Sequence, residues 1–326
     1  MSMTETIKLY DRDAYATEFE ADIISCEPNM ADDKRFDIIL NQTLFFPEEG
    51  GQSPDMGILG GYRVVDVQIK NGVITHTVET LAGDCCEIEK EAGKQIAGSE
   101  FEPEKAELAA GVHVQGKIDW QHRFYNMQQH SGEHIFSGIV HRRFGFENVG
   151  FHLSDSVVTM DFSGVISPED IAEVEHEVNV AISKNIPIEV TYPSRDELAH
   201  LEYRSKIEIE GQVRIVTVPG YDVCACCAPH VKRTGEIGML KVMNYQNYKG
   251  GVRISILCGF RALEAFRQKC DIISELMGIF TTNQEAIVDN VTKLKAVNQS
   301  LKSELGTAKS ALLDYKVAEL PTDTDN

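Results

Sequence analysis

The pentapeptide HSGEH, from His130 to His134, places two imidazoles four positions apart. Four positions are about one turn of an α-helix, so both side chains lie on one helix face, one above the other. Two imidazoles in that arrangement can bind a single metal ion. Apolar residues recur around the pair and predict a long amphipathic helix: Phe124, Met127, Ile135, Phe136 and Ile139.

A second pair of candidate ligands, Cys226 and His230, lies further along the chain in the segment VCACCAPHV. Three imidazoles and one thiolate make a tetrahedral set that suits zinc. Only Cys226 has the CxxxH spacing to His230, although Cys224 and Cys227 are alternative thiolates. The spacing is also compatible with packed helix histidines beside a buried thiol, so by itself it leaves both interpretations open.

The acid within the pentapeptide, Glu133, separates this motif from the HExxH of zinc peptidases. In HExxH the glutamate follows the first histidine and acts as the general base. Here Ser131 follows His130, and Glu133 is expected to point away from the line joining the histidines, at the surface or in a supporting position. The motif therefore weighs against a peptidase.

The composition is ordinary for a globular protein, with 42% hydrophobic residues. No apolar run approaches the ~20 residues needed to cross a bilayer. The start, MSMTETIKLYDRDAYATEFE, is acidic and lacks the apolar core of a signal peptide. The cysteines include two adjacent pairs, Cys85-Cys86 and Cys226-Cys227, which suit a disulfide framework poorly. We therefore expect a reduced, cytoplasmic protein with no membrane partner.

The formal net charge of −20 argues against nonspecific binding to a long nucleic acid, which requires a basic surface. A local basic patch is compatible with that total. Arg123, Arg142 and Arg143 are candidates to contact phosphates. The alternative for each is an ordinary solvated surface charge.

Residues 1–119 have the short strands and glycine turns of a small β-barrel. A hairpin turn is predicted at Asn71-Gly72. A glycine-rich loop with five glycines and two prolines covers residues 47–61, and residues 87–107 form an exposed connection. Strands are predicted at residues 35–46, 62–70, 73–79 and 111–120.

Residues 120–262 alternate helical and strand patterns, which predicts an α+β domain. Ser167 is the expected N-cap of one helix, because acidic residues follow it in the first turn. A further helix is predicted at residues 195–207. Strands are predicted as a pair at residues 148–164, then at residues 186–194 and 212–222, and as two more within residues 235–256.

Residues 263–320 are predicted to form a coiled-coil helix, followed by a disordered tail at residues 321–326. Asn298 at a core position favours a parallel homodimer through residues 284–315, and the alternative is a helix that folds back on its own domain. The two core positions of the heptad are Val291, Asn298, Leu305 and Leu312, and Ile287, Leu294, Leu301, Ala308 and Tyr315.

Four motifs occur in a specific order: HSGEH, then GFH at residues 150–152, then CACCAPHVKRTGEIG, then GVRISILCGFRAL. Together they resemble the editing domain of alanyl-tRNA synthetase, and still more the freestanding alanyl-tRNA editing proteins (the AlaX group). The stretch TLFFPEEGGQSPDMGILGGYRVVDV resembles the glycine-rich segment of that group's longer members. The resemblance covers residues 30 to 262.

The resemblance implies a trans-editing aminoacyl-tRNA hydrolase, which cleaves the carboxylic ester of mischarged tRNA(Ala), chiefly Ser-tRNA(Ala) and also Gly-tRNA(Ala). It implies Zn²⁺ held by His130, His134, Cys226 and His230, of which the first three are expected to be catalytic. The family's second motif is C-G-G-T-H, whereas this chain has C-C-A-P-H. Pro229 restricts the backbone just before the last ligand.

Substrate-binding residues are expected in two segments of the chain. Gly50 and Gly51 let backbone N–H groups approach a phosphate, unless they serve only as barrel turns. Asn148, Gly150 and His152 follow the HSGEH helix and are expected to line the pocket. Two other classes of function remain open: a non-catalytic, zinc-stabilised tRNA- or protein-binding module, and a zinc hydrolase of small molecules that needs no tRNA.

Overall fold

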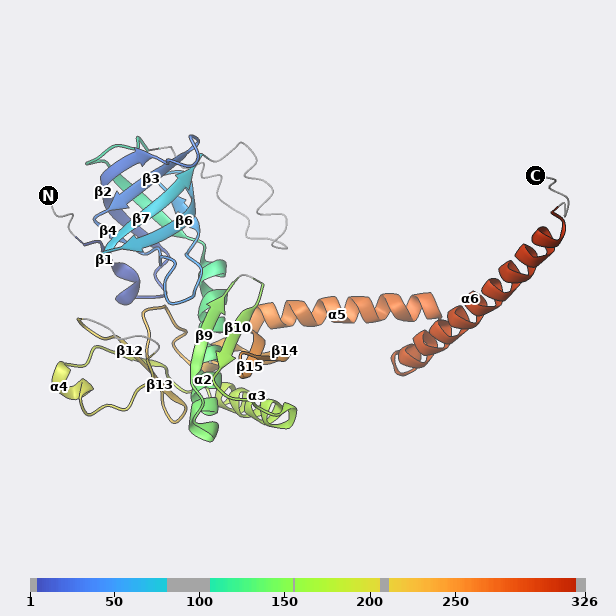
Figure 1. The fold of residues 1–326 in the computed structure, drawn as a ribbon. Coiled ribbons are helices and arrows are strands. Elements are labelled where there is room, and N and C mark those ends of the chain that lie inside the picture. Colours follow the sequence, from blue (N-terminus) through green and yellow to red (C-terminus); the bar gives the residue numbers. More distant parts are fainter. Residues whose placement is uncertain (1–4, 81–105, 155, 206–210, 321–326) are drawn as a thin grey trace, which may run out of the picture. The chain divides into compact units, whose positions relative to one another are not determined.

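The computed structural model describes residues 5–80, 106–154, 156–205 and 211–320. The chain divides into two compact units, Met1–Ala262 and Leu263–Asn326. Sheets and helices are both present, and the chain ends in a long helix, so the α+β class is confirmed (Figure 1). The connection predicted at residues 87–107 lies almost wholly outside the described residues, as does the tail at residues 321–326.

The N-terminal part of the first unit is a closed barrel of six antiparallel strands, in the order β2-β3-β7-β6-β5-β8 (Figure 1). Alternate residues of β2 point inward, and Phe19, Ala21 and Ile23 are buried. The barrel strands are β2 (Glu18–Pro28), β3 (Arg35–Leu40), β5 (Gly57–Leu59), β6 (Tyr62–Lys70), β7 (Val73–Glu79) and β8 (His113–Ile118).

The hairpin of β6 and β7 turns at Asn71 and Gly72, as predicted. Both residues have positive φ, 51° and 77°, which is the conformation a two-residue hairpin turn requires. A short parallel pair, β1 (Ile7–Lys8) with β4 (Gln42–Thr43), lies next to the 3-10 helix η1 (Leu9–Asp11) in the sequence. The N-terminal strand is thereby tied to the segment that leads into the glycine-rich loop.

Helix α2 (Trp120–Phe144) is the central element of the first unit. Asp119 caps its N-terminus by accepting a hydrogen bond from His122 N, and Gly145 ends it at φ 69°. Every residue from Asn126 to Val140 is buried, so the expectation of an amphipathic helix is wrong. Along this stretch, the elements packed around the helix cover it on all sides.

Two glycines let neighbouring elements come close to α2. A Cβ at Gly132 would lie 2.4 Å from Cys258 Sγ, and one at Gly138 would lie 2.4 Å from the Tyr221 carbonyl oxygen. Both approaches are closer than real Cβ contacts, so a larger residue would push the helix away. The absence of a side chain therefore allows strand β15 (Gly251–Cys258) and the start of strand β13 (Asp222–Ala225) to pack against α2.

Two antiparallel sheets accompany α2. A four-stranded sheet has the order β14-β15-β10-β9, and a three-stranded sheet the order β11-β12-β13. Helix α3 (Pro168–Ser183) packs against α2, and Ser167 caps it as predicted. The strands are β9 (Asn148–Leu153), β10 (Val158–Phe162), β11 (Glu189–Thr191), β12 (Ile215–Val218), β13 (Asp222–Ala225), β14 (Leu240–Tyr248) and β15 (Gly251–Cys258), with the 3-10 helix η2 (Thr234–Ile237) before β14.

Within the described residues, the helix predicted at residues 195–207 is wrong beyond its first turn, and its last two positions, 206 and 207, lie outside them. Helix α4 is only Arg195–Leu198, opened by a capping box at Ser194. The chain then extends, because Arg204 pairs with β13: its N–H donates to the Val223 carbonyl at 2.8 Å, and its carbonyl accepts from Ala225 N at 2.9 Å. In this segment, pairing with β13 outweighs the local helix propensity.

The second unit continues α5 (Gly259–Phe280) and holds η3 (Gln284–Ala286) and α6 (Ile287–Ala318). A long C-terminal helix is confirmed, but the single helix predicted over residues 263–320 is interrupted between Phe280 and Ile287. Ile287 is buried, whereas the other large apolar residues at the predicted heptad positions are exposed: Val291, Leu294, Leu301, Leu305, Leu312 and Tyr315. Pairing of this helix with another remains a prediction, as does the division of the first unit at residues 119 and 120.

Candidate metal centre

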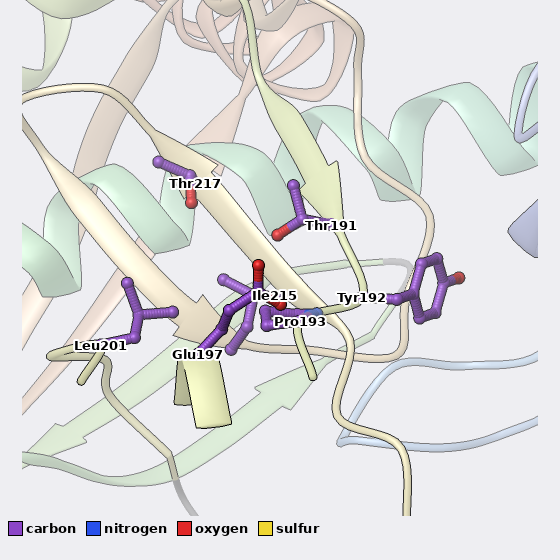
Figure 2. A pocket seen from close by; sticks show the side chains of 7 residues that line it. All are labelled: Thr191, Tyr192, Pro193, Glu197, Leu201, Ile215 and Thr217. Atoms are coloured by element: carbon purple, nitrogen blue, oxygen red, sulfur yellow. The ribbon is translucent and has the colours of Figure 1, made fainter. Parts of the chain in front are cut away.

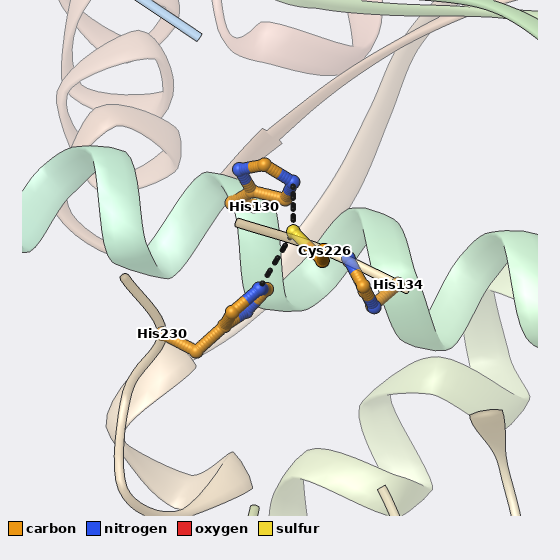
Figure 3. A group of neighbouring side chains, drawn as sticks. All are labelled: His130, His134, Cys226 and His230. Atoms are coloured by element: carbon orange, nitrogen blue, oxygen red, sulfur yellow. Dashed lines mark hydrogen bonds between the residues drawn. The ribbon is translucent and has the colours of Figure 1, made fainter. Parts of the chain in front are cut away.

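Four side chains predicted as ligands lie together: His130, His134, Cys226 and His230 (Figure 3). Their ligand atoms are all within 4.8 Å of one another. Cys226 Sγ is 3.5 Å from His130 Nε2 and 3.4 Å from His230 Nε2. The three histidines are 3–5% exposed. One metal ion could be held by this set.

Two segments far apart in sequence supply these side chains. His130 and His134 come from one face of α2, and Cys226 directly follows β13. The turn that carries Cys226 is held by Arg214, whose Nη1 donates to the carbonyl oxygens of Cys226 at 2.8 Å and Ala228 at 2.9 Å. The ligand loop is therefore fixed through its backbone, and the thiol is directed at the imidazoles.

Each imidazole has a separate partner for its second nitrogen. His130 Nδ1 is 2.8 Å from Gln52 Oε1, and His134 Nδ1 is 3.0 Å from Asp222 Oδ2. His230 Nδ1 is 3.0 Å from Ser131 Oγ. An acceptor at Nδ1 keeps the proton there and leaves the Nε2 lone pair for a metal, as histidine ligands in proteins require. The donor set and its supports both fit zinc.

The electrostatics prepare Cys226 to be a thiolate. Burial opposes the charge, yet the nearby charge of His130 and hydrogen bonds from the three imidazoles hold the pKa of Cys226 well below its usual value. Burial together with the charge of His134 lowers the pKa of His230 to about 3. Cys226 as a thiolate and His230 as a neutral imidazole have the protonation states that a metal requires, whereas His134 holds a second proton below about pH 9 and would release it on metal binding.

Asp222 is the anchor of His134. Burial alone would raise its pKa, but the hydrogen bond with His134 and the charge of Arg204 hold the pKa of Asp222 below its ordinary value. Arg204 binds both carboxylate oxygens, at 2.8 and 2.9 Å. In turn, hydrogen bonds to Asp222 and Cys226 outweigh burial and raise the pKa of His134 to about 9.

The alternative thiolates are less suited to a metal. Cys224 forms a second close group with His134 and Asp222. Burial raises the pKa of Cys224, and the oxygens of Asp222 are already bound to Arg204. Burial and the neighbouring charges of Cys226 and Glu49 also raise the pKa of Cys227. Cys226 is the thiol that the structure places among the three imidazoles.

The glycine-rich loop lies against this cluster. Gly51 O accepts a hydrogen bond from Leu153 N at 2.7 Å, and a Cβ at Gly51 would lie 2.6 Å from the Phe151 carbonyl oxygen. The Phe151 ring is 4.9 Å from that of His130. Gly50 and Gly51 are therefore beside the candidate centre, and their predicted role in substrate binding stays a proposal.

The predicted substrate residues on β9 have different surroundings. Asn148 is buried and donates to Glu133 at 2.6 Å and to Ser137 at 3.1 Å. Gly150 lies over Asp161, since a Cβ there would be 2.8 Å from Oδ2. His152 is exposed. Their predicted roles remain untested proposals.

The structure corrects one expectation about Glu133 and reveals partners that sequence reasoning missed. Glu133 is 1% exposed, so a surface position is wrong, and it supports Asn148 and Ser137. The residues that sequence reasoning missed hold a predicted ligand or face one, except for Arg204, which binds the carboxylate that holds His134. They are Gln52, Ser131, Phe151, Arg204 and Asp222.

Arg123 does not form part of a basic surface. It is fully buried, where Nε lies 2.9 Å from both Asp55 carboxylate oxygens and Nη1 donates to the Ala14 carbonyl at 3.1 Å. The suggestion that it contacts phosphate is therefore wrong. Arg142 and Arg143 lie nearer the surface, paired with Glu177 and Glu173.

A separate pocket of about 370 Å³ lies on the three-stranded sheet (Figure 2). It contains none of the predicted site residues. Its lining is mixed polar and apolar: Thr191, Tyr192, Pro193, Glu197, Leu201, Ile215 and Thr217. Of the helices in the described part of the chain, none combines the length and apolar character that a membrane crossing requires.

Comparison with known proteins agrees with the motifs. Residues 213–255, which include Cys226 and His230, match the family "Threonyl and Alanyl tRNA synthetase second additional domain". The chain is 27% identical over 316 residues to the "Alanyl-tRNA editing protein AlaX-L" of Pyrococcus horikoshii, covering 95% of this chain and 72% of that protein. It is 27% identical to the "Alanyl-tRNA editing protein Aarsd1" of Bos taurus, covering 89% and 63%. It is also 27% identical to the "Alanine--tRNA ligase" of Ignicoccus hospitalis, covering 95% of this chain but 32% of the ligase.

Proposed function

The chain is a relative of the alanyl-tRNA editing proteins, and from that premise we propose that it hydrolyses mischarged tRNA(Ala) in trans. The proposed substrates are chiefly Ser-tRNA(Ala), with Gly-tRNA(Ala) as a second. The observation that carries the proposal is the cluster of three histidines around one cysteine, each imidazole with its own Nδ1 partner. We propose that residues 120–262 supply the metal ligands of this site, and that the protein acts in the cytoplasm.

Such an activity has a physical rationale. A site built to bind alanine cannot exclude glycine, and a pocket gains only about a hundredfold against an added hydroxyl. A second site that destroys the wrong ester raises fidelity beyond that limit. The bond to be cleaved is an activated carboxylic ester, which is easier to hydrolyse than an amide.

The chain's own residues would hold and shield the reacting ester. His130, His134, Cys226 and His230 are the proposed zinc ligands, and Gln52, Ser131 and Asp222 keep the imidazoles in the ligating tautomer. Because four side chains fill a tetrahedral set, zinc bound there would polarise an ester carbonyl, or lower the pKa of a water, only as a fifth ligand. Phe151 packs against His130, with the two ring centroids 4.9 Å apart.

The test is release of serine from Ser-tRNA(Ala), with Ala-tRNA(Ala) and Ser-tRNA(Ser) measured alongside, before and after treatment with a chelator. We expect chelator-sensitive loss of serine from Ser-tRNA(Ala) alone, and restoration by added zinc. Full activity in protein shown by elemental analysis to lack metal would contradict the proposed role of zinc. Equal hydrolysis of free aminoacyl esters would favour a small-molecule hydrolase.

The exposed apolar residues of α6 favour an additional binding role. Val291, Leu294 and Leu301 occupy heptad positions and are 43–58% exposed. A homodimer through residues 284–315 would cover them. A non-catalytic module that binds tRNA or protein without turnover is the alternative function, and it predicts tRNA binding by zinc-loaded protein that releases no serine.

A further inference from the structure

A tight glycine turn places two side chains together beside the candidate metal centre. Glu49 and Gln52 form an antiparallel bridge across the turn, with Gln52 N donating to Glu49 O at 3.1 Å. Between them Gly50 and Gly51 have φ of 62° and 82°, the positive values of a two-residue hairpin turn. Residues that face each other across an antiparallel pair project from the same face. The side chains of Glu49 and Gln52 therefore leave the turn on the same side.

Gln52 has an unused donor in the interior. Its side chain is fully buried, and Oε1 accepts from His130 Nδ1 at 2.8 Å. Among the residues that the structure describes, Nε2 has no hydrogen-bond partner. A buried N–H group without a protein partner is rare in folded proteins and requires an ordered water or a ligand as its acceptor.

The atoms of the other two imidazole supports each have a second partner. Both oxygens of Asp222 bind Arg204 in addition to the contact with His134. Ser131 Oγ also accepts from Val231 N at 3.2 Å. Holding an imidazole therefore does not by itself require an unpaired donor, and the free amide of Gln52 calls for a separate explanation.

Glu49 supplies the complementary group. Its Oε2 atom is buried and, within the described chain, has no hydrogen-bond donor. The carboxylate lies beside Cys227 and shares a side-chain hydrogen bond with it, and after burial and the charge of Cys226 it contributes to the raised pKa of Cys227. Gly50 connects the two, since a Cβ there would lie 3.5 Å from Cys227 Sγ. An anionic acceptor and a neutral donor thus share one face of the turn, next to the ligand loop.

We propose that Glu49 and Gln52 form the seat of the aminoacyl group, and this inference rests on the proposed function. The amide N–H of Gln52 donates to the ester carbonyl oxygen, and the Glu49 carboxylate accepts from the α-ammonium group. A donor beside an anionic acceptor complements any α-amino ester. The pair therefore recognises what seryl and glycyl esters share, and it does not distinguish them.

The first test replaces Gln52 by Glu, which keeps an oxygen for His130 and removes the N–H donor. We expect Gln52→Glu to bind one zinc per chain, as the unchanged protein does, and to lose about 10²- to 10³-fold in kcat/KM, the usual effect of removing one donor to a developing oxyanion. The loss should be equal for Ser-tRNA(Ala) and Gly-tRNA(Ala). Gln52→Leu, which also removes the support of His130, should bind zinc more weakly. A zinc-loaded Gln52→Glu protein within threefold of the unchanged rate would overturn the role of the donor.

The second test replaces Glu49 by Gln, with Glu48→Gln as the matched control. Glu48 is the adjacent carboxylate, exposed and bonded to Gln68. Loss of one charge-assisted hydrogen bond predicts a fall of about 10- to 100-fold in kcat/KM for Glu49→Gln, and no change for the control. Seryl-tRNA(Ala) deaminated with nitrous acid carries a hydroxyl in place of the ammonium group. On that substrate Glu49→Gln should match the unchanged protein, and a persisting difference would contradict the contact.

Binding of a hydrolysis-resistant analogue separates this inference from the proposed function. The probe is 3′-serylamido-3′-deoxyadenosine, titrated calorimetrically into zinc-loaded protein. If the unchanged protein binds the probe without hydrolysing Ser-tRNA(Ala), the proposed function fails. In that case binding alone tests the seat: Gln52→Glu and Glu49→Gln should each weaken binding of the probe at least tenfold relative to Glu48→Gln. Equal affinity of all four proteins, or no binding to any of them, would overturn it.

Discussion

Helices α2 and α6 are both long, yet they distribute polarity in opposite ways. In α2 the buried stretch from Asn126 to Val140 includes amide, hydroxyl, imidazole and carboxylate side chains. In α6 the only buried residue is Ile287, and its leucines are exposed. Polar groups inside α2 are held by named partners and build a site. Apolar groups outside α6 have none within the second unit as described. Buried polar side chains therefore indicate a chemical site, and exposed apolar side chains indicate an association surface.

The largest expected effect comes from removing the thiolate that faces the α2 histidines. Cys226→Ala should lose zinc and lower deacylation of Ser-tRNA(Ala) to the uncatalysed rate, since three imidazoles then lack the charged ligand that completes the set. Zinc content by elemental analysis and serine release by single-turnover assay measure the two losses. Cys224→Ala is the matched control and should retain both. Retention of zinc and activity by Cys226→Ala would show that the cluster is not the metal centre.

The buried charge of Arg123, near the start of α2, should contribute far more to the free energy of unfolding than the exposed charge of Arg143 at the end of the helix. Arg123→Ala leaves Asp55 buried and unpaired, which costs about 3–5 kcal/mol of the free energy of unfolding. Arg143→Ala breaks only contacts at the surface, chiefly the pair with Glu173, with a second carboxylate at Glu177 and the Phe144 ring, worth about 0–1 kcal/mol. Urea unfolding followed by circular dichroism compares the two variants. Similar losses would mean that burial does not set the strength of these pairs.

The pH dependence of the metal-free protein should report the His134–Asp222 pair. The pKa of His134 is raised from 6.5 to about 9, so the folded state binds a proton that the unfolded state releases in that interval. The His134 contribution is complete below pH 6.5 and is lost as the pH rises through 9, with an upper limit of about 3 kcal/mol. The lowered pKa of Cys226 contributes stability that increases with pH over the same interval, so the two contributions oppose each other. Urea unfolding in a chelator between pH 6 and pH 9.5 therefore compares the unchanged protein with Asp222→Asn. The variant should lose less stability, or gain more, as the pH rises, and equal slopes in the two proteins would contradict the pairing.

The smallest change is expected at α6 and concerns association alone. Leu301→Lys places a charge at a heptad core position and should convert a dimer into a monomer without altering the catalytic rate per chain. Sedimentation velocity of the full chain measures the mass. Ser303→Lys, at an exposed position outside the two heptad core positions, is the control. A monomeric unchanged protein would leave the exposed row of α6 without the proposed partner.

Local signals in the sequence were sufficient where the structure is local. The Asn71-Gly72 turn and the cap at Ser167 follow from backbone and hydrogen-bonding preferences of the residues themselves. The spacing of His130 and His134 follows from helix geometry in the same way. The long C-terminal helix was equally predictable, because its heptads repeat without interruption by proline.

Other features depend on partners distant in the chain and could not be read locally. An amphipathic pattern was expected for α2 because the polar residues at its buried positions look like a solvent face. Arg204 continues a helical pattern, but pairing with β13 draws it into an extended segment. Arg123 resembles a surface cation until Asp55 is placed beside it. In the glycine-rich loop the prediction named Gly50 and Gly51, whereas the residue that contacts His130 is the neighbouring Gln52.

The long sequence separations within the centre also set when it can form during synthesis. Gln52 and His130 are 78 positions apart, and His130 and Cys226 are 96 positions apart. A chain still emerging from the ribosome has the barrel and α2 long before it has the thiol and the last imidazole. The centre is therefore absent until translation has passed residue 230. Until then the growing chain lacks the ligands on which the proposed hydrolysis depends.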